Sequence, residues 1–296
     1  MNTIQQQSTM AIDEVPDAQT FLDRTAQLRE TDPIGTNFMC SIVVASMANN
    51  EPMRFWVLST PATSFAFMSS RGTCLSPSMT AHEATALGHV IIQSVDTRIP
   101  RATGPRDAVG ALCAVLCTAQ RLSTTKLHQA LHFYVLDKLR LPVHVPGRLR
   151  LAQAGVDEEV LIGWIRDFWI ADGEPVGDSA AVVARYLKRS GLYLWEVDGV
   201  AVGFAGFGTP VLLGSGDVIY RIAPVYTPPQ ERRKGYATAT TAALCQVLLD
   251  QHTGKDSKCH IMLNVDVANS AAIKAYQNVG FVHQSDAFSF AIEYDA

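Results

Sequence analysis

The chain has 296 residues, which is long enough for two domains of ordinary size. Its 48% hydrophobic and 18% charged content is typical of a folded globular protein and excludes a disordered chain. A formal charge of −4 argues against a broad surface for nucleic acid or anionic lipid, and no apolar run reaches the length of a membrane span. The polar segment 1–13 lacks a basic start followed by an apolar core, so we expect a cytoplasmic protein.

Helical and strand patterns alternate through the first half of the chain. Helices are predicted at Asp17–Arg29, Pro77–Val95 and Asp107–Leu122, and strands at Arg54–Ser59, Ser64–Ser69 and Leu131–Leu136. Alternation of this kind predicts an α/β unit. Because this half is about as long as the second half, a diverged duplicate is one interpretation of the chain.

Four cysteines and histidines have a spacing close to that of a zinc finger. Cys113, Cys117, His128 and His132 run as C-x(3)-C-x(10)-H-x(3)-H. The two cysteines, however, lie in an apolar helical run, and His132 opens a strand-like segment. We therefore expect no metal site, and we expect the six cysteines of the chain to be free thiols.

The clearest internal boundary is Leu141–Gly147, where two prolines and a glycine interrupt periodic sequence. A new strand begins directly afterwards. We therefore predict an N-terminal domain at 1–145 and a C-terminal domain at 146–296.

The C-terminal half is predicted as β-α-α-β-β-β-α-β-α-β. The segments in chain order are Arg148–Ala152, Asp157–Trp169, Ser179–Arg189, Leu192–Val197, Val200–Phe207, Val218–Tyr226, Thr238–Gln251, Cys259–Val265, Ser270–Val279 and Phe288–Ile292. The dipeptide Asp198-Gly199 is the strongest hairpin signal in the chain, and Gly280 stands where glycine favours the end of a helix.

The junction between the strand ending at Tyr226 and the next helix is the most informative segment. Pro228 and Pro229 end the strand, because proline cannot continue a central ladder. Three cations follow, and then Gly235 and Ala237 leave room at the first helical turn. Unpaired N–H groups and the positive end of the helix dipole face outward there, so the junction predicts a cradle for a phosphate or pyrophosphate.

The spacing Arg232-x-x-Gly235-x-Ala237 resembles the Q/R-x-x-G-x-G/A signature of the GCN5-related N-acetyltransferases (GNAT), which hold the pyrophosphate of acetyl-coenzyme A there. A second block, Asn269 to Phe281, is similar to the family's N-x(6)-Y-x(3)-G-F segment. The two blocks cover roughly the last third of the chain. The resemblance implies a GNAT-type mixed twisted sheet flanked by helices, preceded by an α/β domain that is a degenerate GNAT-like, non-catalytic copy.

The resemblance also assigns the donor site. Val225 and Tyr226 would offer backbone groups to the pantetheine arm where the fourth and fifth strands splay apart, and the N–H groups from Arg233 to Ala237 would hold the pyrophosphate. The cofactor-binding residues are then Val225, Tyr226, Arg232, Arg233, Lys234, Gly235, Tyr236, Ala237 and Asn269. For Asn269, a helix N-cap is an equally good interpretation.

Tyr276 matches the family tyrosine that protonates the departing coenzyme A thiolate. Its alternative is a buried tyrosine that packs under Phe281. The general base stays open between a water chain and residues on or near the central strands, which are Glu196, Asp217, Tyr220 and Asp266.

The sequence thus predicts an acetyl-CoA-dependent N-acetyltransferase that moves the acetyl group directly, in a ternary complex, to an amine of a small molecule or peptide. The alternative is a non-catalytic acyl-CoA-binding or regulatory module, against which the presence of Tyr276 counts. A nucleotide-phosphate hydrolase is excluded, because no G-x(4)-G-K-[ST] segment occurs.

Overall fold

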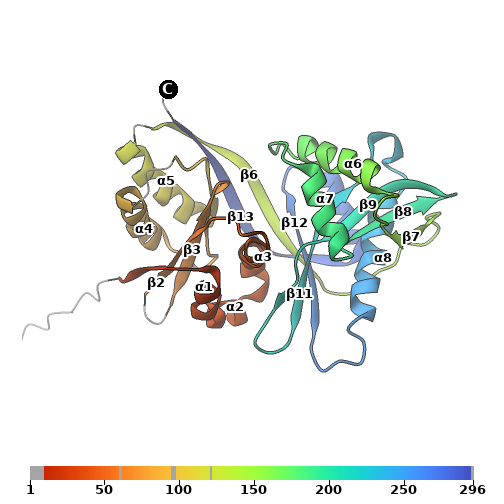
Figure 1. Cartoon of the computed structure of the whole chain (residues 1–296), viewed down its shortest axis with the longest axis horizontal. Helices are drawn as coiled ribbons and strands as arrows, with labels where there is room; N and C mark the ends of the chain where they lie inside the picture. Colours follow the sequence, from red (N-terminus) through yellow and green to blue (C-terminus); the bar gives the residue numbers. More distant parts are fainter. Residues whose placement is uncertain (1–9, 60–61, 95–97, 121, 295–296) are drawn as a thin grey trace, which may run out of the picture. The chain divides into compact units, whose positions relative to one another are not determined.

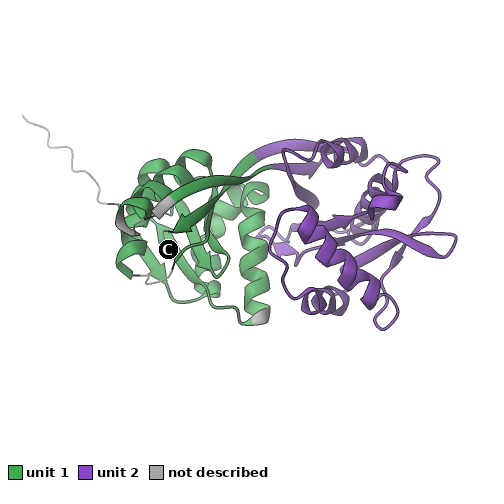
Figure 2. Ribbon diagram, turned by 90° about the horizontal axis from the view of Figure 1, so that it is seen from above, with its two compact units in different colours: residues 1–131, 286–296 green, residues 132–285 purple. Residues whose placement is uncertain are grey.

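The computed structural model describes residues 10–59, 62–94, 98–120 and 122–294. The chain divides into two compact units, which are 1–131 with 286–296 (unit 1) and 132–285 (unit 2; Figure 2). We expected a single boundary between 145 and 146. The division lies elsewhere because two long strands, β6 (Leu122–Leu136) and β13 (Phe281–Tyr294), each contribute residues to both units.

Unit 1 is a strand, three helices, three strands, a helix, a strand and a helix, completed by parts of β6 and β13. In order these are β1 (Ile12–Val15), α1 (Ala18–Arg24), α2 (Ala26–Thr31), α3 (Pro33–Asn49), β2 (Arg54–Leu58), β3 (Ser64–Ser69), β4 (Gly72–Leu75), α4 (Ala81–Ser94), β5 (Arg101–Gly104) and α5 (Arg106–Gln120). Strands β1 to β4 pair antiparallel with their sequence neighbours, whereas β4 and β5 are parallel.

Two helical features of unit 1 differ from the sequence prediction. The helix expected at Asp17–Arg29 is two short helices that meet at Thr25, whose buried hydroxyl donates to the carbonyl of Phe21 at 2.8 Å. Helix α3 was not predicted at all. Apolar residues are spread around its circumference instead of forming one stripe, so the sequence lacks the period that marks an amphipathic helix.

In chain order, the elements of unit 2 are β7 (Arg148–Leu151), α6 (Glu158–Ala171), α7 (Ser179–Lys188), β8 (Leu192–Val197), β9 (Val200–Phe207), β10 (Val211–Leu212), β11 (Val218–Tyr226), the 3-10 turn η1 (Pro229–Glu231), α8 (Tyr236–Asp250), β12 (Cys259–Asp266) and α9 (Ser270–Val279). This is the predicted order, with β10 and η1 as additions. The closing strand expected at Phe288–Ile292 lies instead in the part of β13 that belongs to unit 1, where Phe288 to Ala291 pair with β5. Strands β11 and β12 are parallel, as β4 and β5 are in unit 1. Of the helices described in either unit, none has the length and apolarity to cross a membrane.

Two layers of helices cover the sheet of unit 2 (Figure 1). The strand period of two sends Leu192 and Leu194 into a core with α6 and α7, and sends Tyr193 and Trp195 to the opposite face, which α8 covers. Helix α9 packs on the same side as α8. The junction between β11 and α8 therefore connects the sheet to the helix layer that contains α8.

Candidate active site

The central strands of unit 2 separate beside this junction. Strands β11 and β12 are paired from Val218–Cys259 to Arg221–Met262, and both continue beyond that pair without pairing to each other. On its other side β11 stays attached to β9, where Val225 is paired with Ala205 after a register shift. One edge of the last part of β11 is thus fixed, while the edge toward β12 is open, which leaves backbone groups available to an extended ligand.

Tyr226, at the end of β11, is buried and anchors this strand end. Its ring lies 6.4 Å from the rings of both Trp164 and Phe204. Burial raises the pKa of Tyr226, and the negative charge of Asp167 raises it further. The Tyr226 side chain therefore belongs to the core, and the resemblance assigns only its backbone to the donor.

The predicted cradle has the backbone geometry of an anion site. Between η1 and α8, Arg233 has φ 65° and Gly235 has φ 86°, which are left-handed conformations. Gly235 is the N-cap of α8 and supplies no side-chain hydrogen bond to the first helical turn. The first N–H groups of α8 have no intrahelical partner, so they are available to an anion at the positive end of the helix dipole. A Cβ atom at Gly235 would lie 3.2 Å from a methyl carbon of Val145, which is a tight contact, and the positive φ of this position favours glycine as well.

The three cations of the junction are not equivalent. Arg232 donates from Nε to the carbonyl of Thr227 at 3.0 Å, and Lys234 pairs with Glu231 at 2.9 Å. Arg233 is exposed, and its side chain has no hydrogen-bond or ion-pair partner among the residues that the structure describes. Arg233 is therefore the cation that can meet an incoming phosphate without losing an existing contact.

Three further predicted residues have structural roles at helix starts. Tyr236 is buried against Trp195, and Ala237 follows it, half-buried, in the first turn of α8. Asn269 caps α9, because its Oδ1 accepts from the backbone N–H of Ala272 at 3.1 Å. The N-cap interpretation of Asn269 is confirmed, and its assignment to the donor stays a prediction.

Tyr276 is half-buried on α9, with its ring 6.2 Å from that of Phe281 in an edge-on arrangement. Burial raises the pKa of Tyr276, and the charge of Asp172 adds to the shift. Asp172 ends α6, which covers the opposite face of the sheet from α9. An electrostatic effect across the sheet is consistent with the gap between β11 and β12. The raised pKa keeps the phenol protonated, as a proton donor requires.

The equivalent junction in unit 1, between β4 and α4, is built differently. Thr80 and Glu83 form a reciprocal cap, in which Glu83 Oε2 accepts from the backbone N–H of Thr80 at 2.8 Å and the Glu83 N–H donates to Thr80 Oγ1 at 3.2 Å. The other carboxylate oxygen accepts from Thr63 at 2.6 Å. Burial opposes ionisation of Glu83, but these hydrogen bonds outweigh it and lower its pKa. Sequence reasoning missed this cap, although T-x-x-E is its usual signature.

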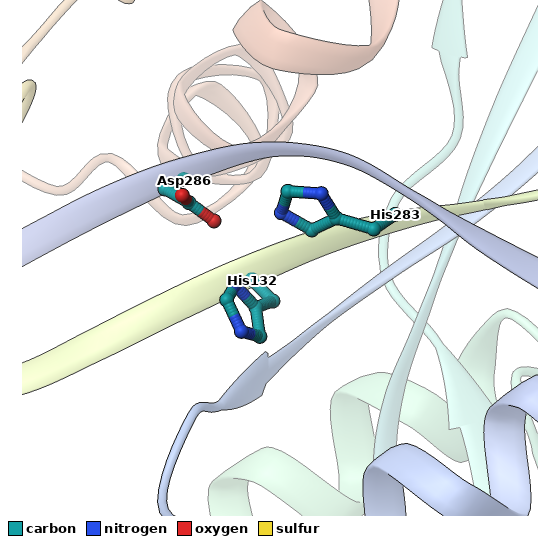
Figure 3. A group of neighbouring side chains, drawn as sticks. All are labelled: His132, His283 and Asp286. Atoms are coloured by element: carbon teal, nitrogen blue, oxygen red, sulfur yellow. The ribbon is translucent and has the colours of Figure 1, made fainter.

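A group of potential metal ligands lies on the two long strands. His132 is on β6, and His283 and Asp286 are on β13, and one nitrogen or oxygen of each lies within 4.8 Å of the others (Figure 3). The histidine rings are 4.7 Å apart. Within the described parts of the chain this is the one such group, so Cys113, Cys117 and His128 do not join His132 in the zinc-finger pattern. All six cysteines are free thiols, as expected.

Comparisons with known proteins concern the family and the fold. Residues 161–281 match the sequence model of the acetyltransferase (GNAT) family. No curated protein matches the chain. Among solved structures, a tandem GNAT protein from the clavulanic acid biosynthesis pathway aligns over 97% of this chain and 100% of its own, with 12% identity and a TM-score of 0.55.

Two bacterial structures align as extensively. A GCN5-related N-acetyltransferase from Sphaerobacter thermophilus covers 96% of this chain and 95% of its own, with 12% identity and a TM-score of 0.59. A GNAT-family acetyltransferase from Colwellia psychrerythraea covers 96% and 100%, with 15% identity and a TM-score of 0.54. At such identities these likenesses concern the fold. Residues 161–281 are a GNAT acetyltransferase domain, in a chain whose fold resembles that of a tandem GNAT protein over nearly its whole length.

Proposed function

We propose that unit 2 is an acetyl-CoA-dependent N-acetyltransferase and that unit 1 is a non-catalytic copy. The observation that carries the proposal is the coincidence of two openings at one place. The edge of β11 toward β12 is open beyond Arg221, and the uncapped start of α8 follows the same strand. A ligand with an amide-rich arm and a pyrophosphate would use both openings, and acetyl-CoA is such a ligand.

The residues present fit this donor. The open edge of β11 near Val225 would pair with the amides of the pantetheine arm. The N–H groups from Arg233 to Ala237 would hold the pyrophosphate, and the free guanidinium of Arg233 would add charge. Gly235 favours the close backbone approach, because an added Cβ atom would lie 3.2 Å from Val145. Acetyl-CoA supplies an activated acetyl group as a thioester.

In the reaction the amine nitrogen forms a bond to the carbonyl carbon, and the carbon–sulfur bond breaks. The tetrahedral oxyanion between these events would be stabilised by backbone N–H groups at the gap, and direct transfer requires amine and donor to be bound together. Tyr276 would donate its phenolic proton to the departing thiolate, and the proton that the amine nitrogen loses would pass through water and restore the phenol. Its raised pKa means that the donor form persists through neutral and mildly alkaline pH.

A binding assay tests this proposal first. Isothermal titration of the full chain with acetyl-CoA is expected to give one site per chain. Steady-state assays with a panel of small amines and lysine peptides then identify the acceptor class. No binding of acetyl-CoA by the folded protein would contradict the proposal. Binding without transfer to any amine would favour the alternative, a non-catalytic acyl-CoA-binding module in which Tyr276 serves to pack against Phe281.

A further inference from the structure

The segment between β6 and β7, residues 137–147, is a fixed strap and not a loose linker. At one end, Asp137 and Arg140 donate backbone N–H groups to the carbonyls of Gly280 and Val279, at 3.2 and 2.8 Å. The carbonyl oxygen of Lys138 abuts the space where Gly280 lacks a Cβ atom. The strap is therefore attached to the C-terminal end of α9.

The other end of the strap is attached beside the cradle. Val145 packs with Tyr236 and Trp195 and lies beside the space where Gly235 lacks a Cβ atom, and the indole Nε1 of Trp195 donates to the carbonyl of Pro146 at 2.9 Å. All of these residues belong to unit 2. The strap thus runs from the end of α9 to the start of α8, and it reaches the cradle at the glycine that the pyrophosphate would approach.

Between its two attachments the strap exposes an unusual combination of side chains. Leu141 is 56% and Val143 is 77% exposed, although both are large and apolar. Lys138 and Arg140 are exposed, and neither side chain has a hydrogen-bond or ion-pair partner in the described part of the chain. An apolar surface next to unpaired cations, attached at both ends and adjoining the predicted pyrophosphate cradle, is complementary to an apolar ring system that carries a phosphate.

We propose that the strap binds the adenosine 3′-phosphate end of coenzyme A, with Leu141 and Val143 against the adenine and with Lys138 and Arg140 on the 3′-phosphate. This inference rests on the proposed function of unit 2. It adds a second donor contact that comes from a segment preceding the GNAT domain, outside the residues that match the family. Continuity with the cradle at Val145 and complementary charge favour this occupant.

Donors that differ by one group test the proposal. Calorimetric dissociation constants would be measured for coenzyme A and for 3′-dephospho-coenzyme A, with the intact protein and with a Lys138→Ala/Arg140→Ala variant. We expect the variant to bind coenzyme A about ten-fold more weakly, and to bind the dephospho form as the intact protein does. The anchors use backbone atoms, so the variant is expected to keep its melting temperature. Lys188→Ala, an exposed cation on α7, is the matched control with unchanged affinity.

A second variant tests the apolar part. Leu141→Ser/Val143→Ser is expected to weaken coenzyme A and the dephospho form equally, by several-fold, and to leave 4′-phosphopantetheine binding unchanged. Equal affinities of the charge variant and the intact protein for coenzyme A would overturn the proposal, as would an equal loss with both donors. If the intact protein binds none of these donors, the proposed function itself fails, which is a different outcome.

Discussion

Helices α4 and α8 have the same place in the order of elements of their units. Each connects two parallel strands, which are β4 and β5 in unit 1 and β11 and β12 in unit 2. In unit 1 the start is closed by Thr80 and the buried carboxylate of Glu83. In unit 2 it is open, with Gly235 as a cap that offers no acceptor. Glu83 thus supplies from within the chain the negative charge that, in our proposal, a ligand supplies at α8.

The neighbouring strands differ in the same sense. The last residue pair between strands β4 and β5 is Cys74 with Thr103, and each strand ends one residue later. Gly104 lies so close to β4 that a Cβ there would be 2.8 Å from that of Leu75. Strands β11 and β12 separate instead. A shared order of elements therefore does not imply a shared ligand site, because the strand edge and the helix start must both be open.

The largest expected effect is at the open cap. Gly235→Val should raise the dissociation constant of acetyl-CoA by on the order of a hundred-fold or more. The valine side chain would strain the left-handed backbone and would lie against Val145. Calorimetry with acetyl-CoA measures it. Gly254→Val is the matched control, since Gly254 has φ 78° but open space around it. Unchanged affinity in a folded Gly235→Val protein would remove the cradle assignment.

The next effect concerns chemistry at the open site. Tyr276→Phe should lower kcat by roughly ten- to ten-thousand-fold and leave the dissociation constant of acetyl-CoA near that of the intact protein. Because burial raises the pKa of Tyr276, loss of the donor form on the alkaline side should occur above the ordinary tyrosine value of about 10.

Tyr193→Phe is the matched control for Tyr276→Phe. Tyr193, on β8, is a buried tyrosine whose pKa is also raised by burial, and it has no proposed role in the reaction. A loss of thermal stability with equal losses of donor affinity and rate in Tyr276→Phe would assign Tyr276 to packing. Full activity would identify another proton donor.

A substitution in the closed cap of α4 is expected to change the stability of the protein and to leave donor binding unchanged. Glu83→Gln should lower the free energy of unfolding by about 1–2 kcal/mol, because it weakens the bonds to Thr63 and Thr80. The pKa of Glu83 is lowered in the folded state, so its contribution is complete above the unfolded value of about 4.3 and is lost as pH falls through the folded value. The difference between variant and parent should therefore shrink below about pH 4.

Denaturant unfolding at several pH values measures the effect of Glu83→Gln, with Glu159→Gln in the exposed first turn of α6 as the control. Titration with acetyl-CoA completes the test. Both the parent and Glu83→Gln should bind one donor per chain. Two donors per parent chain would show that the cap in unit 1 does not exclude the ligand.

The smallest expected effect is a difference in acetyl-CoA affinity between variants of two cations of the cradle. Arg233→Ala should weaken acetyl-CoA binding by about five-fold, since its guanidinium has no described partner to satisfy it. Lys234→Ala should have a smaller effect, because Glu231 already neutralises that ammonium. The reverse order, measured by calorimetry, would show that the ion pair opens to receive the phosphate.

The C-terminal elements and the junction between β11 and α8 were predictable because their information is local. Proline, glycine and a period of two or 3.6 mark where β11 ends and α8 begins. Unit 1 was less predictable, because α3 carries apolar residues on all sides and its period is lost. The role of Val145 was not predictable either, since Leu141–Gly147 has the composition of a linker and only tertiary contact with Gly235 and Trp195 gives it another role.

The sharing of β13 has a consequence for the order in which the protein forms during synthesis. Phe288 to Ala291 pair with β5, so unit 1 lacks a strand until these residues leave the ribosome, after all of unit 2 has been made. Unit 2 can close first, although its chain begins later. A chain truncated between residues 285 and 287 would therefore contain all of unit 2 and would lack the part of β13 that pairs with β5 in unit 1.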